Sequence, residues 1–199
     1  MRDKLRFAFR CDSKPYRLSY TEWSILWWRW LLAIPKAHNP ALDDCGNNCN
    51  QNQFDKNVWF LAGTVTPLVS AKRTCVLPFG RAILFPIVNN LVSYTEYPGL
   101  KKDDDLKSVA GKDFTKELKM QVGIGNMLIT SEVCRIGSEP FEISYPDGNI
   151  FNARPGLSIA VSDGFWIFLS PLPKGTFSVY FVAVEPNYKT EVHYTLRIV

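Results

Sequence analysis

The sequence predicts a mainly β protein of the α+β class, an antiparallel β-sandwich or jelly roll with a tryptophan-rich helix packed on it near the N-terminus. Three observations support this prediction: a capped amphipathic segment near residue 20, seven or more short strand-like segments separated by turn residues, and no repeat of about twenty to fifty residues. With 199 residues, 46% of them hydrophobic, the chain is long enough for one buried core, so we expect a single domain over residues 1–199.

The first predicted element is a helix over residues 20–33. Ser19 and Glu22 have the spacing of a capping box, in which each side chain bonds a free amide at the helix start, and Pro35 ends the helix. Apolar residues at spacings of three and four form one stripe: Trp23, Leu26, Trp27, Trp30 and Ile34. We expect these tryptophans to belong to the core rather than to a ligand platform, with Trp28 beside the stripe and partly exposed.

A polar loop and a series of strands follow. Residues 40–56 are rich in Asn, Asp and Gly, with little to bury, so this loop is either functional or held by its own hydrogen bonds. The predicted strands cover residues 58–66, 73–77, 82–88, 120–122, 127–136, 141–145, 157–161, 165–169, 177–184 and 191–199. Three aspartates open a second predicted helix near residues 103–119, where their charge suits a helix N-terminus.

The numbers of cysteine and histidine residues argue against several kinds of structural and catalytic site. Five cysteines leave at least one thiol free and are too few for a disulfide scaffold. Cys45 and Cys49 are four residues apart, but a structural zinc needs four ligands and the chain has two histidines, so we expect no metal and no cofactor. Neither a Ser-His-Asp nor a Cys-His arrangement can be assembled from His38 and His193.

Charge and hydropathy limit the classes of partner and the cellular compartments that fit this sequence. The net charge is +4, and the basic residues are scattered, among them Arg2, Lys4, Arg6 and Arg73, which predicts a solvated surface and argues against nucleic acid as a partner. The most apolar stretch, residues 25–34, is about half a bilayer span, so we expect no membrane span. A native Met1 would place the protein in the cytoplasm, and a trimmed signal peptide would make it secreted.

The candidate site is a set of carboxylates and amides. Asn39 and Asp43 lie in the polar loop, Asn89 ends a predicted strand, and Glu96 follows a few residues later. Beside aromatic rings, such groups suit a saccharide or another small polar ligand, although Asn and Asp in a long loop also serve to tie it down.

Two classes of function follow from this set. The first is a non-catalytic protein that binds a small polar ligand, a glycan or a protein partner, including a second copy of the chain. The alternative is a carboxylate-dependent hydrolase that uses Glu96 with Asp43 or Asp163. The lack of histidine chemistry favours the first.

Several phrases of the sequence also resemble a family of bacterial and archaeal proteins without an established activity. They are the tryptophan-rich first helix that ends in Ile-Pro (WSILWWRWLLAIP), the WFLAG strand, the RTCxxPxGxAxxFPI segment and the DGFW strand. The resemblance implies a shared fold and no particular chemistry. It also implies that Cys49 and Cys75, which flank the Trp59 strand in the family pattern, approach each other.

Overall fold

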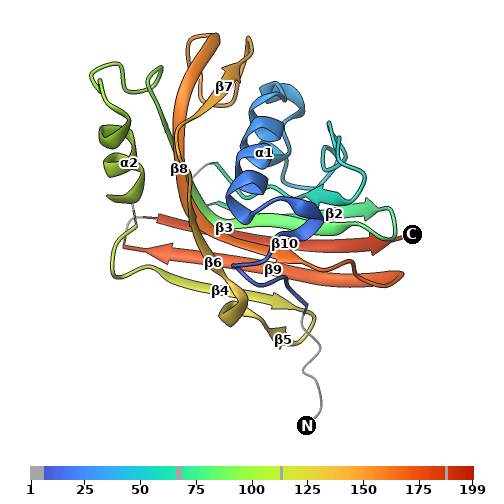
Figure 1. Ribbon diagram of the computed structural model, residues 1–199. Helices are drawn as coiled ribbons and strands as arrows, with labels where there is room; N and C mark the ends of the chain where they lie inside the picture. The colour runs from blue at the N-terminus through green and yellow to red at the C-terminus, as the bar shows by residue number, and fades with distance from the viewer. Residues whose placement is uncertain (1–6, 66–68, 113, 187) are drawn as a thin grey trace.

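The protein is described by a computed structural model that covers residues 7–65, 69–112, 114–186 and 188–199. Two mixed β-sheets pack face to face, one helix covers the outer face of the first sheet, and a second helix lies beside the sandwich (Figure 1). The predicted mainly β sandwich with a packed tryptophan-rich helix is therefore confirmed. Arg2, Lys4 and Arg6 lie outside the described residues.

Each sheet has five strands in the described part of the chain. The first sheet has the order β1-β3-β8-β6, with β7 also on β8, and contains β1 (Val58–Phe60), β3 (Ala82–Ser93), β6 (Cys134–Gly137), β7 (Phe141–Tyr145) and β8 (Gly156–Leu169). The second has the order β2-β10-β9-β4-β5 and contains β2 (Val69–Leu77), β4 (Lys119–Ile124), β5 (Met127–Leu128), β9 (Gly175–Glu185) and β10 (Tyr188–Ile198).

The prediction of purely antiparallel sheets was wrong at two pairings. β1 pairs with β3 in parallel, and β2 pairs with β10 in parallel along nine residues. Both parallel pairs join strands that are not consecutive along the chain, so the turn residues between consecutive strands do not reveal these pairings. The other ladders of the described residues, including β3 with β8 and β9 with β10, are antiparallel.

The main core lies between the two sheets. Phe85 of β3 stacks on Phe181 of β9 with ring centroids 4.9 Å apart, and alternate residues of β10 are buried against them. Residues of one parity in the last strand are buried: Val192, Tyr194, Leu196 and Ile198. Because alternate side chains of a strand point to opposite faces, the other set of β10 faces away from this core.

Helix α1 (Tyr20–Leu32) covers the opposite face of the first sheet and forms a second core with it. Its capping box is present, since the Glu22 amide donates to the Ser19 hydroxyl and the Glu22 carboxylate accepts from the Ser19 amide. Trp23, Trp27 and Trp30 are buried, as the stripe predicts. Trp28 was expected to be partly exposed and is only 4% exposed, because Phe151 and Ser162 cover it.

Several element boundaries differ from the predicted ones. Helix α2 (Asp103–Lys112) ends before the predicted residue 119, and residue 113 lies outside the description. The predicted strand 58–66 ends at Phe60, and residue 66 also lies outside the described residues. The segment 127–136 is divided by a 3-10 turn (Thr130–Glu132), whereas the segments 157–161 and 165–169 belong to the single strand β8.

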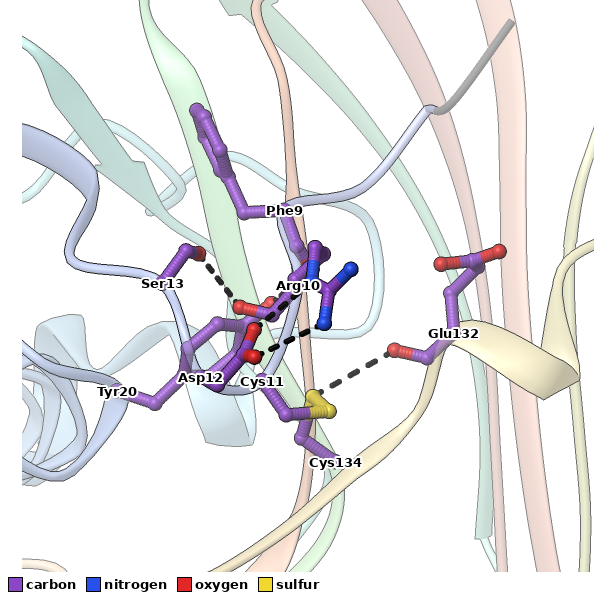
Figure 2. Close-up of polar contacts among 8 residues, drawn as sticks. All are labelled: Phe9, Arg10, Cys11, Asp12, Ser13, Tyr20, Glu132 and Cys134. Atoms are coloured by element: carbon purple, nitrogen blue, oxygen red, sulfur yellow. Dashed lines mark hydrogen bonds and ion pairs between the residues drawn. A yellow bond between two sulfur atoms is a disulfide. The ribbon is translucent and has the colours of Figure 1, made fainter. Parts of the chain in front are cut away.

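A disulfide between Cys11 and Cys134 fixes the N-terminal segment to β6 (Figure 2), and the sequence did not predict this pairing. The segment before it pairs with the end of β8, through Phe9 N to Phe168 O at 2.8 Å and Ser170 N to Phe7 O at 2.8 Å. Arg10 and Asp12 form an ion pair beside the bridge. The disulfide therefore joins two segments 123 residues apart on the same sheet.

Candidate functional site

A pocket of about 240 Å³ opens at the edge of β3, beside α1. Strand β1 pairs only with the first residues of β3, up to Leu84, and the chain then crosses to the second sheet, where the Thr64 and Thr190 hydroxyls are 2.8 Å apart. This divergence leaves the later part of β3 without β1 beside it. The residues that line the pocket come from α1, β3 and its turn, the segment after β1, β10 and two loops: Trp27, Trp28, Leu31, Ala41, Gly63, Thr64, Val65, Pro86, Ile87, Val88, Asn89, Asn90, Leu91, Glu96, Tyr97, Phe151, Tyr188 and Thr190.

The local conformation of β3 places Asn89 in this wall. The ladder between β3 and β8 shifts its register between Pro86 and Val88, where a bulge re-aims the following side chains. Asn89 is then paired with Gly164, and a Cβ atom at position 164 would lie 2.5 Å from the Asn89 Cβ. Only glycine fits there, so Gly164 permits Asn89 to occupy its position.

The amide nitrogen of the Asn89 side chain lacks a partner among the described residues. This Nδ2 atom is buried and donates to no protein acceptor within hydrogen-bond distance there. A buried amide without a partner costs free energy, on the order of 1–3 kcal/mol, and each such group in a folded protein calls for an explanation. A ligand or an ordered water that accepts from Nδ2 would remove this cost.

Glu96 is held at the other side of the pocket by two hydroxyl groups. Its Oε2 accepts from the Ser93 hydroxyl at 3.0 Å and from the Tyr145 hydroxyl at 2.7 Å. Burial raises the pKa of Tyr145 above its ordinary value, so this phenol stays protonated and donates. The contacts found for this carboxylate within the described structure use Oε2, which leaves Oε1 for other partners.

Two tryptophans of α1 form the apolar part of the wall. Trp27 Nε1 donates to Leu61 O at 2.9 Å, and Trp28 Nε1 donates to Ser162 Oγ at 2.7 Å. The rings meet edge to face with centroids 5.0 Å apart. Since both indole N–H groups are satisfied, these rings are fixed and present apolar surface to the pocket.

Asn39, a predicted ligand-binding residue, does not line the pocket. Its Nδ2 donates to Leu31 O at 2.8 Å and to Ile34 O at 2.9 Å, and its Oδ1 accepts from Ala41 N at 3.0 Å. The side chain thus closes the C-terminus of α1 and starts the 3-10 turn Pro40–Leu42. It brings Ala41 to the pocket wall and is itself buried.

Asp43, the second predicted residue of this loop, is also outside the pocket lining. Its carboxylate accepts from the backbone amides of Cys45, Gly46 and Asn48 at 2.7–3.1 Å and from the Cys45 thiol. Although burial acts to raise its pKa, these hydrogen bonds outweigh burial and hold the pKa below its ordinary value. The structure therefore brings Asn89 and Glu96 to one pocket and leaves Asn39 and Asp43 in the supporting loop.

Arg73 connects two walls of the pocket, and the expectation that it belongs to the solvated surface was wrong. It is 2% exposed, and its guanidinium donates to Asp43 O at 2.6 Å, Ala62 O at 2.7 Å and the Tyr194 hydroxyl at 2.8 Å. A fork of five donors suits such a cluster of carbonyl groups. The sequence offers a weak signal for this role, since Arg73 has the same parity along β2 as the buried residues Ala71 and Cys75.

Sequence reasoning also missed four aromatic or hydroxyl residues of the wall. Tyr97 and Phe151 come from two loops, whereas Tyr188 and Thr190 lie two residues apart in β10, so three segments meet only in the folded chain. No sequence spacing connects these three segments. Lys, Arg and His are absent from the described lining, and Glu96 is its one carboxylate residue.

Comparisons with known proteins add no identification. No family model matches the chain, and searches of curated proteins and of solved structures found no match. Within the described residues, no cluster of three or more His, Cys, Asp or Glu side chains could hold a metal ion. The described helices include none of the length and apolarity needed to cross a membrane. Function is therefore inferred from the residues of the pocket alone.

Proposed function

We propose that this protein binds a small polar ligand of the glycan type in the pocket between α1 and β3, without catalysing a reaction on it. The observation that carries the proposal is the buried Nδ2 of Asn89, which has no hydrogen-bond partner in the described structure and belongs to a residue of the pocket wall. Glu96 supplies a carboxylate, and the indoles of Trp27 and Trp28 supply apolar surface in the same wall.

The chemistry of the wall favours a hydroxylated ligand. A hydroxyl group both donates and accepts, so it matches the amide of Asn89 as a donor and the carboxylate of Glu96 as an acceptor. The C–H groups of a sugar ring match indole surfaces. An anionic ligand is disfavoured, because the lining has one carboxylate and no cationic side chain in its described part.

The size of the pocket limits the ligand. Its volume of about 240 Å³ is below the roughly 300–1,000 Å³ typical of pockets for drug-sized ligands. This volume favours one sugar-sized ring, with any further rings outside the pocket.

Hydrolysis is not proposed, because the two other carboxylates considered for it are engaged elsewhere. A two-carboxylate glycosidase needs its acid and its partner about 5–9.5 Å apart across the substrate. Asp43 is bound by backbone amides of its own loop, and Asp163 pairs with Arg135 at 2.8 Å. Asp163 also points to the face of β8 opposite that of Ser162, which contacts α1.

The proposal is tested with soluble neutral monosaccharides and short oligosaccharides, screened by thermal shift and then by isothermal titration calorimetry. For a sugar that binds, Asn89→Ala is expected to weaken affinity roughly 10-fold or more, because one hydrogen bond to the ligand is lost. Glu96→Gln is expected to have a similar effect, and it keeps an oxygen that can accept from Tyr145 and Ser93. Both variants should melt close to the parent.

Matched controls are Asn47→Ala and Glu117→Gln, since both residues are exposed and outside the pocket lining. They should bind as the parent does. Unchanged affinity in Asn89→Ala and Glu96→Gln would show that the sugar does not bind in this pocket. Unfolding of both variants would make the two residues structural ties and remove the support for a binding site.

A further inference from the structure

The Asn-rich loop runs along the backbone of β2. Lys72 N donates to Asp44 O at 3.2 Å, and Thr74 N donates to Cys45 O at 2.9 Å. Gly46 follows with a φ of +95°, and a Cβ atom at this position would lie 2.5 Å from Thr74 O. The loop is therefore packed backbone to backbone against β2 immediately before Cys75.

This packing brings two thiols together. Cys49 N donates to Gly46 O at 3.2 Å, so Cys49 follows the point of closest approach by one tight turn. Cys49 and Cys75 belong to the same buried cluster, their thiols lie close enough to interact, and the two cysteines are 8% and 1% exposed. The predicted approach of Cys49 and Cys75 is thus confirmed, and both are free thiols in the structure.

We propose that Cys49 and Cys75 are a redox modification site, which a low-molecular-weight disulfide such as oxidised glutathione converts to a second disulfide of the protein. The Cys49 thiolate attacks one sulfur of the reagent, forming a mixed disulfide and releasing one thiolate. Cys75 then loses its proton to that thiolate and attacks the Cys49 sulfur, and the second reagent sulfur leaves as a thiolate that takes up, through solvent, the proton lost by Cys49. Two protein thiols are oxidised, and one reagent disulfide is reduced to two thiols.

The order of the two attacks follows from exposure and from the contact between the thiols. Cys49 has the greater exposure of the pair and lies in the loop, whereas Cys75 lies within β2. The contact with Cys75 lowers the pKa of Cys49, and the same contact raises the pKa of Cys75. Cys49 is therefore the thiol that first becomes a nucleophile.

Cys45 is the natural control among the three free thiols. It is exposed, and its Sγ donates to the Asp43 carboxylate at 3.1 Å. The three free thiols and the Cys11–Cys134 bridge account for all five cysteines. We assign no disulfide partner within the chain to Cys45.

The experiment oxidises the fully reduced and refolded protein with oxidised glutathione, alkylates the remaining thiols, and maps the peptides by mass spectrometry without reduction. We expect a Cys49–Cys75 peptide beside the Cys11–Cys134 peptide, and Cys45 free of internal links. Cys11–Cys134 reports that oxidation was sufficient. A map in which this bridge forms while Cys49 and Cys75 are alkylated, glutathionylated, or linked to Cys45 would overturn the proposal.

Thermal melting gives a second readout. Positions 49 and 75 are 26 residues apart, and cross-linking a loop of this length should raise the melting temperature by roughly 5–10 °C relative to protein with both thiols alkylated or reduced at this pair. The variant C49S retains the Cys11–Cys134 bridge but should lack this part of the rise. An equal rise in parent and C49S would also contradict the proposal.

Discussion

In the loop after α1, the type of a polar residue does not determine whether its side chain binds a ligand or holds the loop. Asn39 and Asp43 have the side chains that a polar ligand needs, but their hydrogen-bonding groups are directed to nearby backbone groups. Short Asn and Asp side chains serve both purposes, so sequence alone left the two roles open. Asn89 and Glu96 were predicted by the same reasoning, and these two do line one pocket.

At this scale, Asp43→Asn is predicted to weaken the fold in a pH-dependent way. The folded pKa of Asp43 lies below its ordinary value of 3.8, so its charged form stabilises the fold fully above about pH 5. That stability is lost as the pH falls through and below 3.8. The neutral amide should therefore cost about 1–3 kcal/mol near pH 6, and the difference from the parent should shrink near pH 3.

Urea unfolding of parent and variant at both pH values measures this difference. Asp44→Asn is the control, because Asp44 is the exposed neighbour of Asp43. A difference between parent and Asp43→Asn that is as large near pH 3 as near pH 6 would contradict the role assigned to the carboxylate.

At the scale of elements, helices and strands whose bounds depend on neighbouring residues could be predicted, and those whose bounds depend on distant contacts could not. The bounds of helix α1 were predicted to within one residue, because its capping box and its apolar stripe are formed by residues close together in the sequence. Strand β8 was read as two strands, since Ser162, Asp163 and Gly164 are typical turn residues. In the structure, Gly164 lies inside β8. A glycine is needed there because Asn89 of β3 occupies the space that a side chain at position 164 would fill.

Helix α1 is predicted to be anchored by its tryptophans. Trp27→Ala should reduce the free energy of unfolding by roughly 3–5 kcal/mol, because the indole is buried against Trp30 and Trp166 and its N–H is bonded to Leu61 O. Leu26→Ala is the comparison, and its cost should be smaller since Leu26 is half-buried. Chemical denaturation measures both, and a Trp27→Ala variant as stable as the parent would refute this packing.

At the scale of the whole molecule, the sandwich class could be predicted, and the way its sheets are closed could not. Alternating and apolar segments indicate strands, and the tryptophan stripe indicates a helix on their surface. The parallel pairs β1 with β3 and β2 with β10, and the disulfide between residues 11 and 134, depend on contacts distant in the sequence. The pocket is a product of those contacts, because it opens where β1 leaves β3.

The central claim, that a polar ligand binds beside α1 at the edge of β3, is tested most directly by a two-dimensional amide NMR titration of the assigned protein. The ligand is the tightest-binding neutral saccharide of the screen. We expect the largest shift changes at Gly63–Val65, Ile87–Leu91, and Glu96 and Tyr97, all in the pocket wall. Changes concentrated on the outer face of the second sheet, for example at Tyr180 and His193, or no saturable changes with any saccharide of the screen, would contradict it.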